Sequence, residues 1–143
     1  FNATAALAPG STGAVIVEPL LASGELDALC RDVIRPFYEQ RSRQAVEWLQ
    51  EACRDVPLRI HRPEGAFFLW LWFPGLPVTS HELYRRLKAH GVLVLSGHHF
   101  FPGLDQPWPH RDECLRIHCA QAPETMRAGI ALIAEEVRRA YGS

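Results

Sequence analysis

The chain has 143 residues, 48% of them hydrophobic, which is long and apolar enough for one domain with a sizeable core and argues against disorder. A formal net charge of −1 and a pI of about 6.7 give no electrostatic reason to expect nucleic acid or an acidic membrane surface as a partner.

The start of the chain lacks a basic segment and a sustained apolar core, so we expect no secretion signal. Residues 1–10 show no periodicity and are expected to form an extended arm. Four cysteines are spread along the chain, which suits reduced thiols better than a disulfide framework. We therefore expect a cytoplasmic protein.

A short helix is predicted over residues 14–21, with Ser11 as its N-cap and Gly24 after its end. The arm and this helix make up a first segment, residues 1–23. The remainder, residues 24–143, is predicted to form the domain proper, so that the chain is a single domain overall.

A long helix should follow, because apolar residues recur at helical spacing over residues 26–56. Pro36 lies inside this run. It should kink or break the helix near Arg35, since proline removes a backbone donor and crowds the preceding turn.

Residues 66–73 contain no polar side chain and end at Pro74, which predicts a central strand buried on both faces. Shorter strands are expected over residues 58–61 and 92–95. In the last predicted strand, residues 115–119, Leu, Ile and Cys alternate with Arg and His.

Two further helices have recognisable starts. Thr79 and Glu82 fit a capping box, with Gly91 at the end of the helix that they open. Pro123 is expected at the first position of the last helix. The element order predicts an α+β fold, in which a small, mostly antiparallel sheet is packed with helices and preceded by a long helix kinked at Pro36.

Arg116 is the first candidate for chemistry, because the alternation turns it away from the sheet face of Leu115 and Ile117. A planar guanidinium can bind a carboxylate through two parallel hydrogen bonds. Arginine in a strand is more commonly solvated or part of a structural ion pair, so the residues alone leave both interpretations open.

Other reactive residues give weaker signals. Cys114 and His118 would lie about 13 Å apart along a strand, too far to share one ion, and we expect no metal site. Lys88 is the only lysine and is expected to face water near a helix end rather than to form a Schiff base. The aromatic loop over residues 98–104 could either line a pocket or plug the core.

Several segments carry a family pattern when they are taken together in chain order. They are residues 64–73, 91–105, 107–110 and 114–117, with further matches at residues 7–10 and 34–38. These segments look like the C-terminal part of an aminotransferase of the fold-type-I class. Within that family they look most like the enzymes that exchange an amino group between valine and pyruvate, giving alanine and 2-oxoisovalerate.

The resemblance implies a large domain that binds pyridoxal phosphate, a small C-terminal domain, and a homodimer acting on amino acids and 2-oxo acids. It also implies that Arg116 binds the substrate α-carboxylate. Gly65, Gly97, His98 and Phe100 match segments that approach the substrate. Nucleic acid and membrane have no place among the implied partners.

One feature of the family is missing here. The Schiff-base lysine, and the groups that hold the phosphate and the pyridine ring, lie upstream of the matching segments. We therefore expect a fragment with no catalytic residue of its own, no bound pyridoxal phosphate and no activity when isolated. Ser96 also departs from the family, where proline is common. The alternative is a free-standing, non-catalytic binding or dimerisation module with the same small-domain fold.

Overall fold

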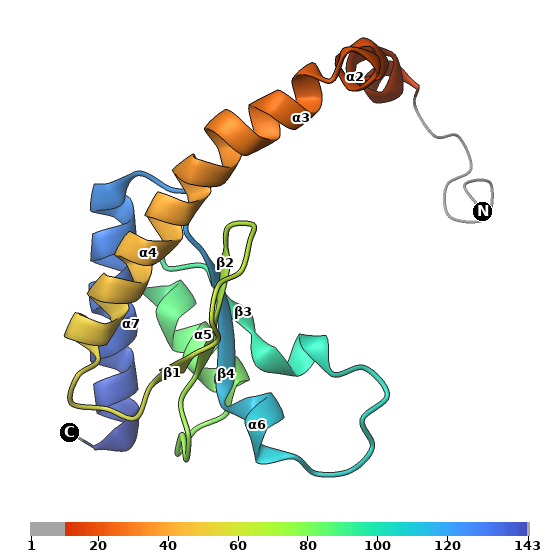
Figure 1. Ribbon diagram of the computed structural model, residues 1–143. Coiled ribbons are helices and arrows are strands. Elements are labelled where there is room, and N and C mark those ends of the chain that lie inside the picture. The colour runs from red at the N-terminus through yellow and green to blue at the C-terminus, as the bar shows by residue number, and fades with distance from the viewer. Residues whose placement is uncertain (1–10, 143) are drawn as a thin grey trace. The chain divides into compact units, whose positions relative to one another are not determined.

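The computed structural model describes residues 11–142, and the chain divides into two compact units between Phe37 and Tyr38 (Figure 1). The arm expected over residues 1–10 lies outside the described residues. The domain boundary expected after residue 23 falls within the first unit and stays a prediction. Among the described helices, none is long and apolar enough to cross a membrane.

The first unit is helical. It contains α2 (Thr12–Ser23), α3 (Glu25–Leu29) and the π-helical turn η1 (Cys30–Ile34). Gly24 ends α2 with a φ of 78°, in the left-handed conformation that glycine adopts without strain. Ser11 occupies the N-cap position, but its side chain makes no capping hydrogen bond. The short helix is thus confirmed, with an N-cap weaker than expected.

Pro36 does not break the helix, and the turn before it is widened into a π-helical turn. The backbone N–H of Arg35 donates to the carbonyl of Cys30, five residues back, as in a π-helix. Helix α4 (Arg35–Ala52) then continues with regular geometry. Proline at the second position of α4 has no N–H to offer to the preceding turn, and the wider turn accommodates this loss.

The second unit is built on a four-stranded antiparallel sheet (Figure 1). Its strands are β1 (Arg59–Ile60), β2 (Phe68–Trp72), β3 (Leu95–Ser96) and β4 (Cys114–His118), in the spatial order β1-β2-β4-β3. The predicted α+β architecture is confirmed. The strand expected over residues 92–95 is shorter than predicted and begins only at Leu95.

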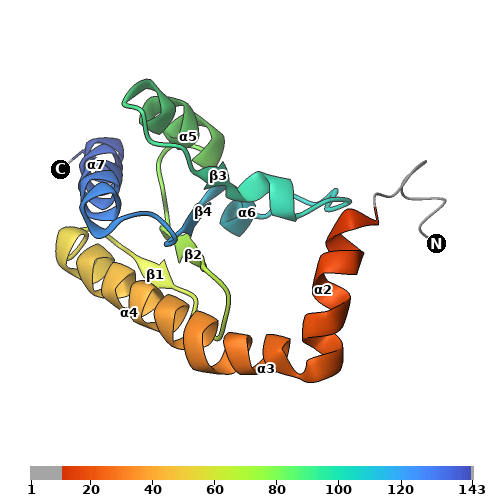
Figure 2. The same cartoon turned by 90° about the horizontal axis from the view of Figure 1, so that it is seen from above.

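Helices α4, α5 (Ser80–Ala89) and α7 (Pro123–Tyr141) lie on one side of this sheet (Figure 2). Pro123 occupies the first turn of α7, as predicted. The core forms where the apolar faces of these helices meet the inner face of the sheet. Its members include Ala45, Leu49, Leu69, Leu71, Leu83, Leu87, Leu115, Ile117, Ile130, Ile133 and Val137.

The expectation that residues 66–73 are buried on both faces is wrong. Leu69 and Leu71 are buried, whereas Trp70 and Trp72 are half-buried and Phe68 is 40% exposed. The helices cover only the inner face. The outer face is partly covered by the 3₁₀-helix η2 (Gly97–Phe100) and the short helix α6 (Pro109–Asp112), so side chains on that face remain accessible.

The capping box of α5 is half formed. The backbone N–H of Glu82 donates to the Thr79 hydroxyl at 3.2 Å, as predicted. The Glu82 carboxylate does not complete the box but pairs with Arg86 at 3.1 Å, one helical turn later. Gly91 adopts a left-handed conformation one residue after the C-cap, where it lets the chain leave the helix.

Candidate functional site

Arg116 lies at the middle of β4, between two neighbouring strands. Its Cα is paired with Trp70 of β2 on one side and with Leu95 of β3 on the other. Leu115 and Ile117 are buried in the core, so Arg116 projects from the outer face of the sheet. The face predicted from the sequence alternation is therefore confirmed, and the residue is held by a strand with partners on both sides.

Two aromatic rings bracket the Arg116 guanidinium. Its Cζ lies 4.2 Å from the ring centroid of Phe68 and 4.6 Å from that of Phe100. The Nε atom is buried and has no hydrogen-bond partner within residues 11–142. None of the ion pairs found between described residues involves Arg116, so the structural ion pair that the sequence left open is not made within this part of the chain.

Arg116 and Gly65 share a pocket of about 200 Å³. Its walls come from the turn before β2, from β2 itself and from β4. The lining residues are His61, Arg62, Pro63, Glu64, Gly65, Phe68, Leu69, Trp70 and Arg116. Ala66, directly after Gly65, has a φ of 57°, which marks a sharp change of chain direction as this turn enters the strand.

Of the other residues predicted to approach a substrate, Phe100 contacts Arg116 directly. Gly97 is buried and packs against the backbone of Cys114, where a Cβ atom would lie 2.7 Å from the Cys114 carbonyl oxygen. His98 is not among the residues that line the Arg116 pocket. Its Nδ1 lies 2.7 Å from the Ser96 hydroxyl.

His98 belongs to a small group of histidines beside α5. Its ring lies 3.9 Å from that of His99 and 5.3 Å from that of His81. Burial lowers the pKa of His98, and the neighbouring His99 and His81 lower it further. His98 therefore favours the neutral form, which suits the hydrogen bond with Ser96 better than a role as a cation.

The aromatic loop after β3 packs on the outer face of the sheet. The rings of Phe100 and Phe101 lie 5.2 Å and 6.1 Å from Trp70, and Trp108 lies 5.2 Å from Phe101. The loop thus packs on the outer face, and its Phe100 lies against the Arg116 guanidinium. None of residues 98–104 lines the Arg116 pocket or belongs to the buried core, so neither interpretation that the sequence left open describes this loop.

Phe68 belongs to the site but is not among the residues predicted from the sequence, because residues 66–73 were expected to be buried on both faces. Phe68 alternates with Leu69, and this alternation could have placed Phe68 on the same outer face as Arg116.

The remaining candidates lie apart from this site. The Sγ of Cys114 lies 3.6 Å and 3.7 Å from the ring nitrogens of His110, and the described residues contain no group of three or more His, Cys, Asp or Glu side chains that could hold a metal ion. Lys88 is exposed on α5, with its Nζ 5.9 Å from the Tyr84 ring centroid.

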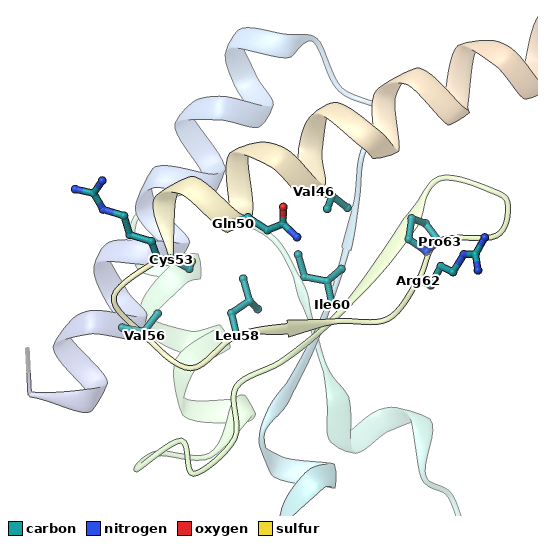
Figure 3. A pocket seen from close by; sticks show the side chains of 9 residues that line it. Val46, Gln50, Cys53, Val56, Leu58, Ile60, Arg62 and Pro63 are labelled. Carbon is teal, nitrogen blue, oxygen red and sulfur yellow. The ribbon is translucent and has the colours of Figure 1, made fainter.

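A second pocket, of about 360 Å³, lies between the end of α4 and β1 (Figure 3). Val46 and Gln50 approach it from the helix, Cys53 from the turn that follows the helix, and Ile60 from the strand. Burial raises the pKa of Cys53 to about 11, so its thiol is neither ionised nor reactive at neutral pH.

Comparison with known proteins identifies relatives of the whole chain. No family model matches it. Valine–pyruvate aminotransferase of Escherichia coli K12 is 44% identical over 141 residues, which are 99% of this chain and 34% of that enzyme. A crystal structure of valine–pyruvate aminotransferase from Salmonella typhimurium LT2 has a TM-score of 0.90 at 44% identity, covering 99% of this chain and 37% of that chain. A putative amino-acid aminotransferase from Psychrobacter arcticum gives a TM-score of 0.91 at 44% identity, with 99% and 33% covered.

The fold and the sequence therefore confirm the predicted resemblance to aminotransferases. Within that class, the chain is similar over nearly all its length to part of valine–pyruvate aminotransferase. It spans about a third of the length of this curated relative, which is consistent with a C-terminal portion.

Proposed function

We propose that the chain is the C-terminal portion of a pyridoxal-phosphate-dependent aminotransferase that exchanges an amino group between valine and pyruvate, giving alanine and 2-oxoisovalerate. Arg116 is the residue that binds the substrate α-carboxylate. One observation carries this proposal. The Arg116 guanidinium lines a pocket and forms no ion pair with a carboxylate of the described residues.

The surroundings of Arg116 suit a carboxylate ligand. Phe68 and Phe100 stabilise the positive charge through their ring faces but provide no oxygen acceptor. Leaving a buried donor such as Nε without an acceptor costs about 1–3 kcal/mol, and a bound carboxylate would remove this cost. Because the guanidinium is planar, two parallel hydrogen bonds would also fix the orientation of the ligand.

The other pocket residues would then position the rest of the substrate. Gly65 offers a stretch of backbone without a side chain, and the space around its missing Cβ is open. Phe68 and Phe100 would exclude water from the bound carboxylate. The chain's own contribution is thus to bind the acid end of the substrate and to orient its Cα–H bond.

The described residues do not fit the cofactor itself. Lys88, the only lysine in the sequence, is exposed on α5 and does not line the Arg116 pocket. We therefore propose no catalytic and no cofactor-binding residue in this chain, and an isolated chain without activity. Pyridoxal phosphate would bind to the longer parent protein, where it supplies the carbanion chemistry of transamination. A borohydride-stable adduct at Lys88 of the isolated chain would contradict this assignment.

The parent protein is further proposed to be a cytoplasmic homodimer. Free thiols at all four cysteines support a reducing compartment. Dimerisation rests only on the resemblance. If the chain were instead a free-standing binding module, it would not replace the matching part of an aminotransferase, and a chimera built with it would be inactive.

A chimera provides the test, with this chain replacing the matching part of the E. coli enzyme. Changing Arg116→Lys removes the planar fork while keeping the charge, so the KM values for valine and pyruvate should rise about tenfold or more. Arg127→Lys is the matched control, because Arg127 also lies over an aromatic ring, that of Trp48, but outside the pocket. Unchanged Michaelis constants in the Arg116 variant would refute the proposed role.

A further inference from the structure

A row of hydrogen-bonded side chains holds η2 against α5. The hydroxyls of Ser80 and Ser96 lie 2.7 Å apart, and Nδ1 of His98 lies 2.7 Å from the Ser96 hydroxyl. Both serines are buried, and the His98 ring at the end of the row is half-buried. A hydrogen-bonded row that begins in the protein interior fixes the position of its last member, in this case the His98 ring.

The 3₁₀-helix η2 connects this row to the Arg116 site. Gly97, at the start of η2, packs against the backbone of Cys114. Phe100, at its end, has its ring centroid 4.6 Å from Cζ of Arg116. Because η2 is a single short turn, its last residue should follow any shift of His98. The position of His98 therefore determines how Phe100 lies against the guanidinium.

Three histidine rings meet where η2 faces the start of α5. The ring centroid of His98 lies 3.9 Å from that of His99 and 5.3 Å from that of His81. His81 is in the first turn of α5, where the helix dipole disfavours a cation, and the neighbouring Glu82 pairs with Arg86. None of the ion pairs found within residues 11–142 joins a carboxylate to any of the three rings. The arrangement suits neutral rings and opposes protonation of more than one of them.

The other titratable groups around the cluster change this balance little. On α6, Asp112 favours the protonated form of His98 and Arg111 opposes it. Nε of Arg111 and Oδ2 of Asp112 lie 3.6 Å apart, so the carboxylate already has a cation beside it. On β4, burial raises the pKa of Cys114 to about 12, so its thiol carries no charge where histidine titrates. On α5, the Tyr84 ring lies 6.1 Å from that of His81 and offers no carboxylate.

We infer that His98 is a positioning residue for substrate binding, and that the cluster of His81, His98 and His99 makes this positioning sensitive to mild acid. With neutral rings, η2 holds Phe100 against Arg116. When the rings take up protons, their repulsion moves η2 away from α5, and Phe100 shifts off the guanidinium. The carboxylate of the substrate then binds less tightly. This inference rests on the proposed role of Arg116.

The titration of His98 fixes the direction of the effect and limits its size. Burial lowers the pKa of His98 below its ordinary value of 6.5, and His99 and His81 lower it further, so the neutral form predominates at neutral pH. If only this form holds Phe100 in place, the KM for pyruvate should rise as the pH falls. A pKa below 6.5 limits the rise to about tenfold at pH 5.5.

Asparagine separates the charge of His98 from its hydrogen bond. His98→Asn keeps an amide near the position of Nδ1, which can bond to Ser96 but cannot be protonated in this range. In the chimera with the E. coli enzyme, the KM for pyruvate at pH 5.5 is divided by the same variant's KM at pH 7.5. This ratio should be several-fold larger for the parent chimera than for His98→Asn, because the pH dependence of the reaction itself is common to both. Equal ratios would overturn the inference.

His90→Asn is the matched control. His90 lies at the other end of α5 and pairs with Glu136 rather than with another histidine. The ratio of KM values in this variant should equal that of the parent chimera. A ratio as low as that of His98→Asn would show that any histidine of the domain has the same effect, and would contradict the role of the cluster.

A second readout requires no catalysis. In the isolated chain, the nuclear Overhauser effect between the Phe100 ring protons and the Arg116 side chain should be present at pH 7.5 and weaken at pH 5.5. It should persist at pH 5.5 in the double variant His81→Asn with His99→Asn, which lacks the neighbouring charges. An effect of equal strength at both pH values in the unsubstituted chain would overturn the inference.

The combined outcomes distinguish this inference from the proposed function. If Arg116→Lys raises the KM while the parent chimera and His98→Asn give equal ratios, the proposed function stands and the inference fails. If Arg116→Lys leaves the KM unchanged while acid still weakens the contact between Phe100 and Arg116, the proposed function fails, and the acid-sensitive position of η2 is supported.

Discussion

Arg138 on α7 and Asp55, just beyond the end of α4, form an ion pair in which Nε donates to Oδ2 at 2.6 Å. The same guanidinium donates from Nη2 to the carbonyl oxygen of Ala52, the last residue of α4. Arg138 thus satisfies a free carbonyl at a helix C-terminus, where a cation is also favoured by the helix dipole. One side chain joins two helices that lie far apart in the sequence.

Replacing Arg138 by Gln should therefore lower the midpoint of urea unfolding. The variant loses the ion pair and weakens the contact to the Ala52 carbonyl. Arg85→Gln is the control, because Arg85 also pairs with a carboxylate, that of Glu82, but on the solvent-facing side of a single helix. A midpoint shift no larger than that of the control would mean that the contacts of Arg138 between α4 and α7 do not stabilise the folded chain.

The Arg138 contact should also make stability depend on pH. The hydrogen bond from Arg138 lowers the pKa of Asp55 below its ordinary value of 3.8. The unfolded state then binds the proton more readily, so the contribution is fully present above pH 3.8 and is lost as pH falls through the folded-state pKa. The difference in unfolding midpoint between the wild-type chain and Asp55→Asn should shrink over that acid range and stay constant near pH 7.

Gly97 should tolerate no side chain. A Cβ atom there would lie 2.7 Å from the carbonyl oxygen and 2.8 Å from the Cβ of Cys114, so Gly97→Ala should cost about 1–3 kcal/mol of unfolding free energy. Gly129→Ala is the matched control. Nothing lies within 4 Å of its Cβ position, and alanine in a helix should gain about 0.5–1 kcal/mol. Chemical denaturation measures the unfolding free energy of both variants. If the two substitutions changed it in the same direction, this packing would be contradicted.

The buried hydroxyls of Ser80 and Ser96 lie 2.7 Å apart and connect α5 to β3. Ser96→Ala should cost about 1–3 kcal/mol, because the Ser80 hydroxyl loses this partner while it stays buried. The double variant Ser80→Ala with Ser96→Ala should cost less than the sum of the two single changes, since neither hydroxyl is then left behind. Additive free energies in a double-mutant cycle would show that the two hydroxyls do not interact.

Thiol chemistry should distinguish Cys30 from the other cysteines of the isolated chain. Cys53, Cys114 and Cys119 are buried, and burial raises the pKa of Cys114 to about 12. At pH 8, Ellman's reagent should therefore modify Cys30 rapidly and the other three only on unfolding. Cys30→Ser should abolish the rapid phase, and a rapid phase that survives this change would contradict the burial of the others.

Local chemistry predicted much of this fold. The alternation around Arg116 fixes its face because successive side chains of a strand point to opposite sides. Pro36 disturbs its helix because of its own missing N–H, and Pro123 begins α7 for the same reason. These properties belong to single residues and their immediate neighbours, so they can be recognised without knowledge of the fold.

The parts that the sequence did not predict depend on distant segments. Phe68 meets Arg116 only because β2 pairs with β4 in a register that places Phe68 opposite His118 and Trp70 opposite Arg116. The apolar run around them suggests burial, but whether its second face is covered depends on where the loop after β3 folds. The pocket shared by Gly65 and Arg116 has the same origin, because its walls come from segments far apart in the chain.

The pairing of β2 with β4 also has a consequence for biosynthesis. During translation, the aromatic strand Phe68–Trp72 leaves the ribosome well before its hydrogen-bonding partner Cys114–His118 has been made. Until then its Leu-Trp-Leu-Trp sequence has only the two-residue β1 beside it. The nascent chain should therefore depend on chaperones over this interval, and a premature stop before Cys114 would leave an aggregation-prone strand.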